Sequence, residues 1–155
     1  MKNTYTKGLG AIELLIVFAV LALIVAIVIP QLVSMRQNQT LKSAVEDVLS
    51  TVEKARAKSI ASYNSSSYGV HFQSDKVIIF KGTSYVSNDA NNESIDILSP
   101  ATISNVTLGG VSGVSGDVYF QRIYGVPSKS GTVTVTNGSS SKIITISTTG
   151  NTSKN

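Results

Sequence analysis

The sequence contains no cysteine, and that absence excludes two kinds of site. Without thiols the chain has neither a disulfide framework nor a thiolate metal centre. Its one histidine, His71, lies in a segment where apolar and polar residues alternate, so we expect a packing or surface residue and not a catalytic base. The sequence also lacks a Gly-x-Ser-x-Gly elbow. We accordingly expect no enzymatic activity.

Acidic residues are few, and those of the C-terminal part are scattered. The glycine-rich segment 109–116 lacks the lysine of a phosphate-binding loop, so it is predicted to be a flexible turn region. The late loops have almost no carboxylates, which argues against a calcium site. The formal net charge of +4 does not call for a nucleic-acid partner. The composition therefore predicts neither a cofactor nor a metal.

The sequence does contain one long apolar run, which continues from Leu9 to Ile29. As a helix rising about 1.5 Å per residue, this segment is about 32 Å long and can cross the roughly 30 Å hydrocarbon core of a bilayer. Its one charged residue is Glu13, and an unpaired carboxylate costs about 3 kcal/mol at the centre of a bilayer and less near its edge. No lysine, arginine or histidine lies between Lys7 and Arg36. We therefore predict that Glu13 pairs with a cation of another chain.

The residues around Glu13 resemble the N-terminal signature of type IV pilins and type II secretion pseudopilins. In that family a short basic leader ends in glycine, a prepilin peptidase cuts after it, and the fifth mature residue is glutamate. A cut between Gly8 and Leu9 makes Glu13 the fifth residue and Pro30 the twenty-second, where the family tends to have proline. The family usually has Phe-Thr-Leu between the cut and the Ile-Glu pair, and this chain has Leu9-Gly10-Ala11.

This resemblance implies how the missing cation arises. In the family the new α-amine, here on Leu9, is methylated and neutralises the glutamate of a neighbouring subunit in a filament. An ammonium and a carboxylate attract strongly at low dielectric, whereas either group alone is penalised. Glu13 and Pro30 are then assembly residues. The implied partners are a prepilin peptidase, other pilin or pseudopilin subunits, an inner-membrane assembly platform and the lipid bilayer.

The resemblance also implies a function and a location. The chain would be a structural subunit of a type IV pilus or type II secretion pseudopilus, acting as a minor pilin that primes or tips the filament; a major pilin is the close competitor. It would cross the inner membrane once, with its head outside the cytoplasm, and then enter a filament in the periplasm or at the cell surface. A secretory signal peptide fits less well, since the apolar core is too long and contains Glu13. A plain membrane anchor fits the length but does not call for Glu13.

Four segments are predicted: a leader (1–8), a transmembrane helix (9–29), an amphipathic helix (30–63) and a β-rich head (64–155). Pro30 is expected either to kink the helix or to end it. The amphipathic part has an apolar stripe, and Glu53 and Arg56 on the opposite, solvated face are spaced three apart, as in a weak surface pair. That face is predicted to carry Lys42, Glu46, Glu53 and Arg56, and the stripe Leu41, Val45, Val48, Val52 and Ala55.

Beyond residue 67 the period changes from helical to alternating, and β-branched residues become common. The predicted fold is α+β, with a long N-terminal helix packed on a mostly antiparallel sheet, as in pilins. The layout resembles the minor H-type pseudopilins and FimT-like minor pilins through Ala55-Arg56 and the strand Gly69-Val70-His71-Phe72. The predicted strands are 68–73, 76–81, 94–98, 102–108, 117–121, 132–136 and 142–147.

A second class of function is a minor pilin that binds DNA, since FimT-like members can bind DNA during natural transformation. Such binding requires a cationic patch that meets phosphates without reading bases. Four cationic residues are candidates for this patch, but they are spread over more than thirty residues, a pattern that is more typical of a solvated surface. The candidate DNA contacts are Arg122, Lys129, Lys142 and Lys154.

Overall fold

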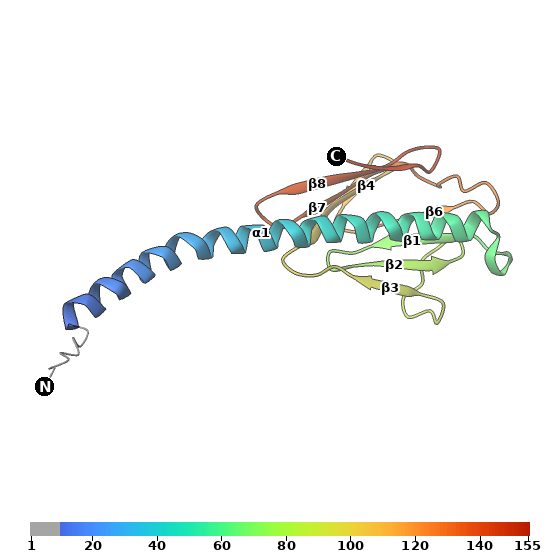
Figure 1. Cartoon of the computed structure of the whole chain (residues 1–155). Helices are drawn as coiled ribbons and strands as arrows, with labels where there is room; N and C mark the ends of the chain where they lie inside the picture. The colour runs from blue at the N-terminus through green and yellow to red at the C-terminus, as the bar shows by residue number, and fades with distance from the viewer. Residues whose placement is uncertain (1–9) are drawn as a thin grey trace, which may run out of the picture. The chain divides into compact units, whose positions relative to one another are not determined.

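The computed structural model describes residues 10–155, in which one long helix precedes two β-sheets (Figure 1). The helix, α1, runs Ala11–Ile60 and is followed by a 3-10 turn, η1 (Tyr63–Ser65). The strands are β1 (Tyr68–Phe72), β2 (Lys76–Lys81), β3 (Glu93–Asp96), β4 (Thr102–Leu108), β5 (Val111–Gly113), β6 (Gly116–Phe120), β7 (Gly131–Thr136), β8 (Ser141–Ile146) and β9 (Thr152–Lys154). The observed class is α+β, which confirms the predicted fold.

Helix α1 continues through Pro30, so the alternative that this proline ends the helix is wrong. Proline has no N–H to donate to the preceding turn, but the residues on both sides keep the helical path. On its C-terminal side, the hydroxyl of Ser34 donates to the carbonyl of Pro30 at 3.0 Å. The chain divides into two compact units between Arg36 and Gln37, and each is described by itself.

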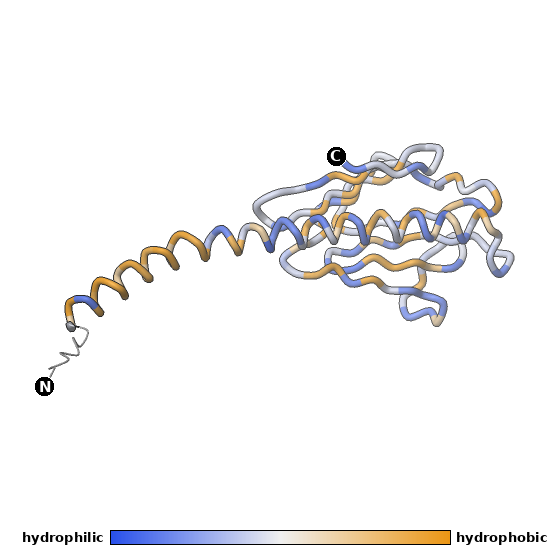
Figure 2. The backbone as a smooth tube through the Cα atoms, viewed as in Figure 1, coloured by the Kyte–Doolittle hydropathy of each residue, from blue (hydrophilic) through white to orange (hydrophobic). Residues whose placement is uncertain are grey.

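The second unit, residues 37–155, contains the hydrophobic core. Its sheets have the strand orders β3-β2-β1-β6 and β5-β4-β7-β8-β9, and every neighbouring pair is antiparallel. The apolar stripe of α1 packs into this core, and Val48, Val52 and Ala55 have no exposed surface. Figure 2 shows the apolar residues of the helix beside those of the strands. The predicted stripe is therefore confirmed as the buried face.

The seven predicted strands are all present, with ends that differ from the prediction by at most two residues. Two short strands were not predicted. Strand β5 lies in the glycine-rich segment that was expected to be a flexible turn region, and it pairs with β4 across Gly109-Gly110. Strand β9 pairs with β8. Both are edge strands without a buried side chain, so neither has the apolar alternation by which strands are predicted.

The C-terminal part of α1 is joined to the sheets by polar side chains. The hydroxyl of Ser59, which is fully buried, donates to the carbonyl of Ala55 and accepts from the amide of Tyr68 at 2.8 Å. This serine connects the helix to the start of β1. Because buried polar groups are costly when unpaired, Ser59 stabilises one particular position of the helix on the sheet.

The predicted surface pair between Glu53 and Arg56 is wrong, because both side chains reach toward late loops. The guanidinium of Arg56 donates to the carbonyls of Gly125 and Thr149, at 3.1 Å each, and to the amide oxygen of Asn151 at 3.3 Å. Glu53 accepts from the hydroxyl of Thr152 at 3.0 Å. Helical spacing alone had suggested a solvated face, but the loops before β7 and β9 cover part of it.

An ion-pair network joins β3 to α1. The carboxylate of Glu93 bridges Lys54, at 2.7 Å, and Lys58. Hydrogen bonds donated by Lys54, which has the larger effect, and by Lys58 hold the pKa of Glu93 below its usual range. Since the pKa is depressed in the folded state, this stabilisation is complete above the unfolded-state pKa and is lost as the pH falls through the lower folded-state pKa.

We expect Glu93→Gln to lower the free energy of unfolding by about 0.5 kcal/mol at neutral pH, a small value because the network is largely solvated. At a pH below the folded-state pKa of Glu93 the substitution should have no effect. Urea titrations at the two pH values measure the difference. Asp96→Asn serves as the control, because Asp96 lies on the same strand and takes part in none of the ion pairs among residues 10–155. An equal loss at both pH values would contradict the assignment.

Candidate functional site

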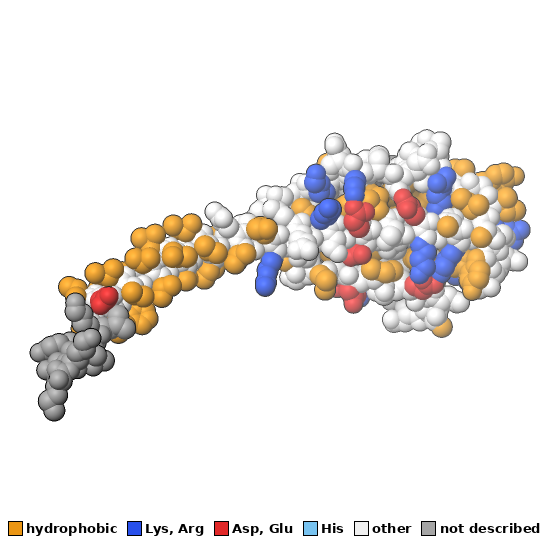
Figure 3. Space-filling view, viewed as in Figure 1, with side chains coloured by type: hydrophobic (Ala, Val, Ile, Leu, Met, Phe, Trp, Pro, Cys, Tyr) orange, Lys and Arg blue, Asp and Glu red, His pale blue; other side chains and the backbone are white. Residues whose placement is uncertain are grey.

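The first half of α1 carries a surface that is almost wholly apolar. The helix includes a stretch long enough and apolar enough to cross a membrane, and none of that stretch is buried within the structure. Exposed fractions reach 75% for Ile12 and 67% for Leu15. Figure 3 shows the apolar side chains gathered along this part of the helix. Exposed apolar area of this extent marks a surface that lipid or other protein covers.

Glu13 lies in the first turn of α1, among these apolar side chains. Its amide donates to the carbonyl of Gly10 at 3.0 Å, so the backbone here is already helical. The first turn is where a carboxylate is most favourable, because the helix dipole places partial positive charge there. Glu13 takes part in none of the ion pairs between described side chains. That the partner of Glu13 belongs to another chain therefore stays a prediction.

Of the other predicted assembly and processing residues, the structure describes only Pro30. Gly8 and Leu9, the predicted cleavage and methylation positions, lie outside the described residues. Pro30 lies inside the continuous helix, among exposed apolar neighbours such as Ile29 and Leu32. The apolar surface therefore extends past the proline, as far as Met35, whose exposed fraction is 67%.

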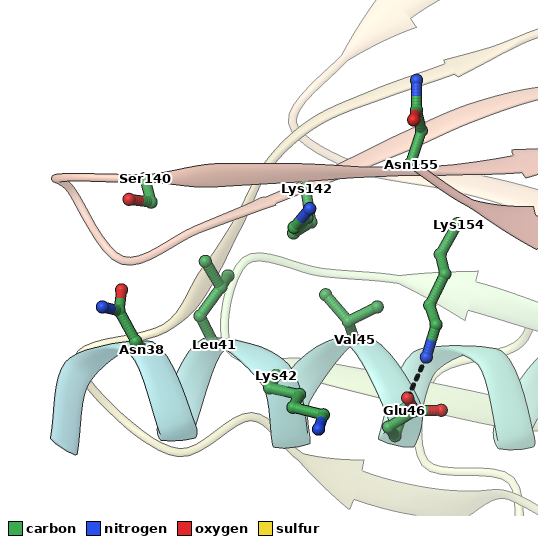
Figure 4. Close-up of a pocket in the computed structure, with 9 residues that line it drawn as sticks. All are labelled: Asn38, Leu41, Lys42, Val45, Glu46, Ser140, Lys142, Lys154 and Asn155. Atoms are coloured by element: carbon green, nitrogen blue, oxygen red, sulfur yellow. Dashed lines mark hydrogen bonds and ion pairs between the residues drawn. The ribbon is translucent and has the colours of Figure 1, made fainter. Parts of the chain in front are cut away.

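A second feature is a groove in the unit formed by residues 37–155, between α1 and the strands β8 and β9 (Figure 4). We call it the lysine groove. Its volume is about 570 Å³. The buried side chains of Leu41 and Val45 contribute apolar surface, and Lys154 reaches across it to pair with Glu46 on the helix. The groove is lined by Asn38, Leu41, Lys42, Val45, Glu46, Ser140, Lys142, Lys154 and Asn155.

The lysine groove brings together two of the four predicted DNA contacts, Lys142 and Lys154, but not the other two. Arg122 donates to the carbonyl of Ser65, just beyond the C-terminal end of α1, whereas the groove lies along Asn38 to Glu46. Lys129 packs its aliphatic chain near Gly109. DNA contact by these four residues stays a prediction, and the third lysine of the groove, Lys42, was missed because it was assigned to a solvated face.

The single histidine lies in a small polar cluster at the pairing of β1 and β6. One nitrogen of His71 contacts Asp117, and the other lies 3.1 Å from the side-chain amide of Gln73. The ring stacks on Tyr85 with 3.9 Å between centroids and 3° between planes. Both ring nitrogens and one ring face therefore have partners. Among residues 10–155 no group of three or more His, Cys, Asp or Glu side chains could hold a metal ion.

No family model, no curated protein and no solved structure matches the chain. The observed architecture, a long apolar N-terminal helix packed on antiparallel sheets, is compatible with a pilin-like fold. Because a fold alone does not determine function, function is inferred from the apolar first part of α1 with its Glu13 and from the lysine groove.

Proposed function

We propose that this protein is an assembly subunit of a filament of the type IV pilin class, either a pilus or a secretion pseudopilus. The observation that carries the proposal is Glu13, a carboxylate in the first turn of an otherwise apolar, membrane-length helix. A membrane anchor alone has no use for this carboxylate, because it makes insertion less favourable. A filament of packed helices uses it when a neighbouring subunit supplies a cation.

The position of Glu13 relative to Gly8 supports the same proposal. Cleavage between Gly8 and Leu9 creates an α-amine four residues before Glu13, at the start of the same apolar segment. Two neighbouring subunits that are offset along their helices can then bring the amine of one to the carboxylate of the other. The attraction between the ammonium and the carboxylate offsets the cost of removing both charges from water. The subunit would cross the inner membrane once before assembly, with residues 37–155 outside the cytoplasm, and would act as a minor subunit at the tip or in priming.

The experiment is N-terminal mass analysis of the full-length protein recovered from cells that express a prepilin peptidase. We expect a chain that begins at Leu9 and carries one methyl group on its α-amine. Gly8→Asp should leave residues 1–8 attached to nearly all of the protein, because a carboxylate cannot fit where the peptidase requires the smallest residue. As a matched control, Asn3→Asp adds the same charge to the leader away from the cleavage position and should be processed like the parent. Recovery of the parent with Met1 to Gly8 intact would contradict the proposal.

A further inference from the structure

We propose that the lysine groove binds the phosphate-bearing headgroup of an anionic phospholipid in the membrane that α1 crosses. This inference rests on the membrane-spanning part of the proposed function, and it does not depend on filament assembly. It adds a ligand, with a stated chemistry, to the unit formed by residues 37–155.

The side chains of the lysine groove carry an excess of positive charge. Three lysines line the groove against one side-chain carboxylate, and that carboxylate, Glu46, already pairs with Lys154. Lys42 and Lys142 take part in none of the ion pairs found within the described part of the chain. Both ammonium groups are therefore available to contact an anion in the groove. A phosphodiester, whose single negative charge is shared by two oxygens, can accept a hydrogen bond from each of these lysines.

Lys142 occupies an unusual position for a charged residue in its sheet. Side chains two apart on a strand share a face, so Lys142 lies on the same face of β8 as Ile144 and Ile146, which are buried in the core. Lys142 therefore occupies the position where the next residue of the core would be expected. With this lysine in place of an apolar residue, the position lines the groove, whose wall on α1 includes the largely buried Leu41 and Val45. An amphipathic anion, with apolar carbons beside its charge, fits such a site better than a free ion.

The lysine groove follows closely in the chain on the segment that would lie in the bilayer. The groove begins at Asn38, which is nine residues after the predicted end of the transmembrane segment at Ile29 and three after Met35, where the exposed apolar surface ends. Three residues span at most about 11 Å, whatever the angle between the two units. The headgroup layer is about 5–8 Å thick on each side of the hydrocarbon core. Lysines near anionic headgroups are attracted to them, and this attraction falls off within a Debye length.

A nucleic acid fits these observations less well. A strand of DNA needs a cationic track along several phosphates, usually with aromatic stacking platforms. The groove is instead a short, partly apolar site, and Arg122, the arginine of the predicted DNA patch, contacts Ser65 at the other end of the packed part of α1. The size and composition of the groove favour one headgroup.

The experiment compares the full-length protein in nanodiscs of phosphatidylcholine with the protein in nanodiscs that also contain phosphatidylglycerol. The reactivity of each lysine toward an acylating reagent is followed by peptide mass analysis. We expect Lys42 and Lys142 to react about fivefold more slowly in the anionic discs, with Lys76 and Lys129 unchanged. High salt should reduce the protection.

The variant Lys142→Gln distinguishes a bound headgroup from a general surface potential. If one headgroup is held by both lysines, this variant restores the reactivity of Lys42 in anionic discs, whereas a surface potential leaves Lys42 slow. Lys129→Gln is the matched control and should leave Lys42 protected. Lys142 is exposed near the start of β8, so its replacement should not prevent folding, and a thermal melt verifies this.

Several outcomes would overturn the inference. Equal reactivity of Lys42 in the two kinds of disc would do so, as would protection of Lys42 that survives in Lys142→Gln. Equal protection in phosphatidylcholine discs by added inorganic phosphate or by a single-stranded oligonucleotide would assign the groove to a soluble anion or to nucleic acid. If the protein is not retained in the discs, both this inference and the membrane part of the proposed function fail. Insertion without protection removes only this inference.

Discussion

Replacing Glu13 with alanine is expected to leave the protein in the membrane and to remove it from filaments. The substitution makes the helix more apolar, so insertion becomes easier. In a filament, however, the α-amine of a neighbouring Leu9 would lose its partner in a low-dielectric interior. Leaving one member of a buried ion pair unpaired costs about 3 kcal/mol, which predicts a drop in incorporation of about a hundredfold. Fractionation of cells into membranes and sheared filaments, followed by quantification of the subunit, measures both effects.

The matched control for this experiment is Glu53→Gln. It removes a carboxylate from the same helix, but from the part packed in the head, where Glu53 accepts a hydrogen bond from Thr152. We expect parent-level incorporation. Glu13→Gln should behave like Glu13→Ala, since the neutral amide cannot balance an ammonium charge. Filaments that contain the Glu13→Ala protein at the parent level would show that the pairing has no role in assembly.

Replacing Gly131 with alanine is expected to unfold the head. Gly131 begins β7, the middle strand of its sheet, where it pairs with Leu108 of β4 and Ile146 of β8. A β-carbon at this position would lie 1.9 Å from the carbonyl oxygen of Thr107 and 2.9 Å from the α-carbon of Leu108. Both atoms belong to backbone and cannot rotate away. We expect a loss of about 4 kcal/mol in the free energy of unfolding, at the upper end of single-substitution effects.

Gly138→Ala provides the contrast for Gly131→Ala. Gly138 has a φ of +87° in the turn between β7 and β8, and a β-carbon there would meet no atom within 4 Å. Its replacement should cost only the strain of a left-handed backbone, about 1 kcal/mol. Thermal melts of the two variants separate a steric clash from a conformational preference. Similar melting temperatures for both would contradict the close approach of β4 and β7 at Gly131.

The elements that the sequence predicts are those with a regular pattern of buried residues. Strand β7 alternates the buried residues Val133 and Val135 with partly exposed threonines, and its predicted range differs by one residue from the observed one. The regular spacing of apolar residues likewise predicts the apolar stripe of α1. Such a pattern does not predict β5 and β9, because hydrogen bonding to a neighbouring strand forms an edge strand without requiring a buried side chain.

The candidate sites divide in the same way. Glu13 could be recognised from the sequence because a carboxylate in an apolar run is unusual. The whole pattern also lies within one short segment. The lysine groove could not, because it joins Lys42 to Lys142 and Lys154, which are far apart in sequence and come together only through the docking of α1 on the second sheet. One local signal was present: Lys142 precedes Ile144 and Ile146 in the same alternation, so it was predictable as a charge on the core face of a strand.

The contacts between α1 and the C-terminal strands also affect the order in which the head can form during synthesis. Arg56 is 95 residues away from its partner Asn151, Glu53 is 99 from Thr152, and Glu46 is 108 from Lys154. The ribosome therefore produces the apolar stripe of α1 long before the residues that help to enclose it. Contacts of such long range form slowly, because a large loop must close first. Until β8 and β9 emerge, part of this stripe stays uncovered in a nascent chain whose helix already exposes an apolar surface of membrane-spanning length.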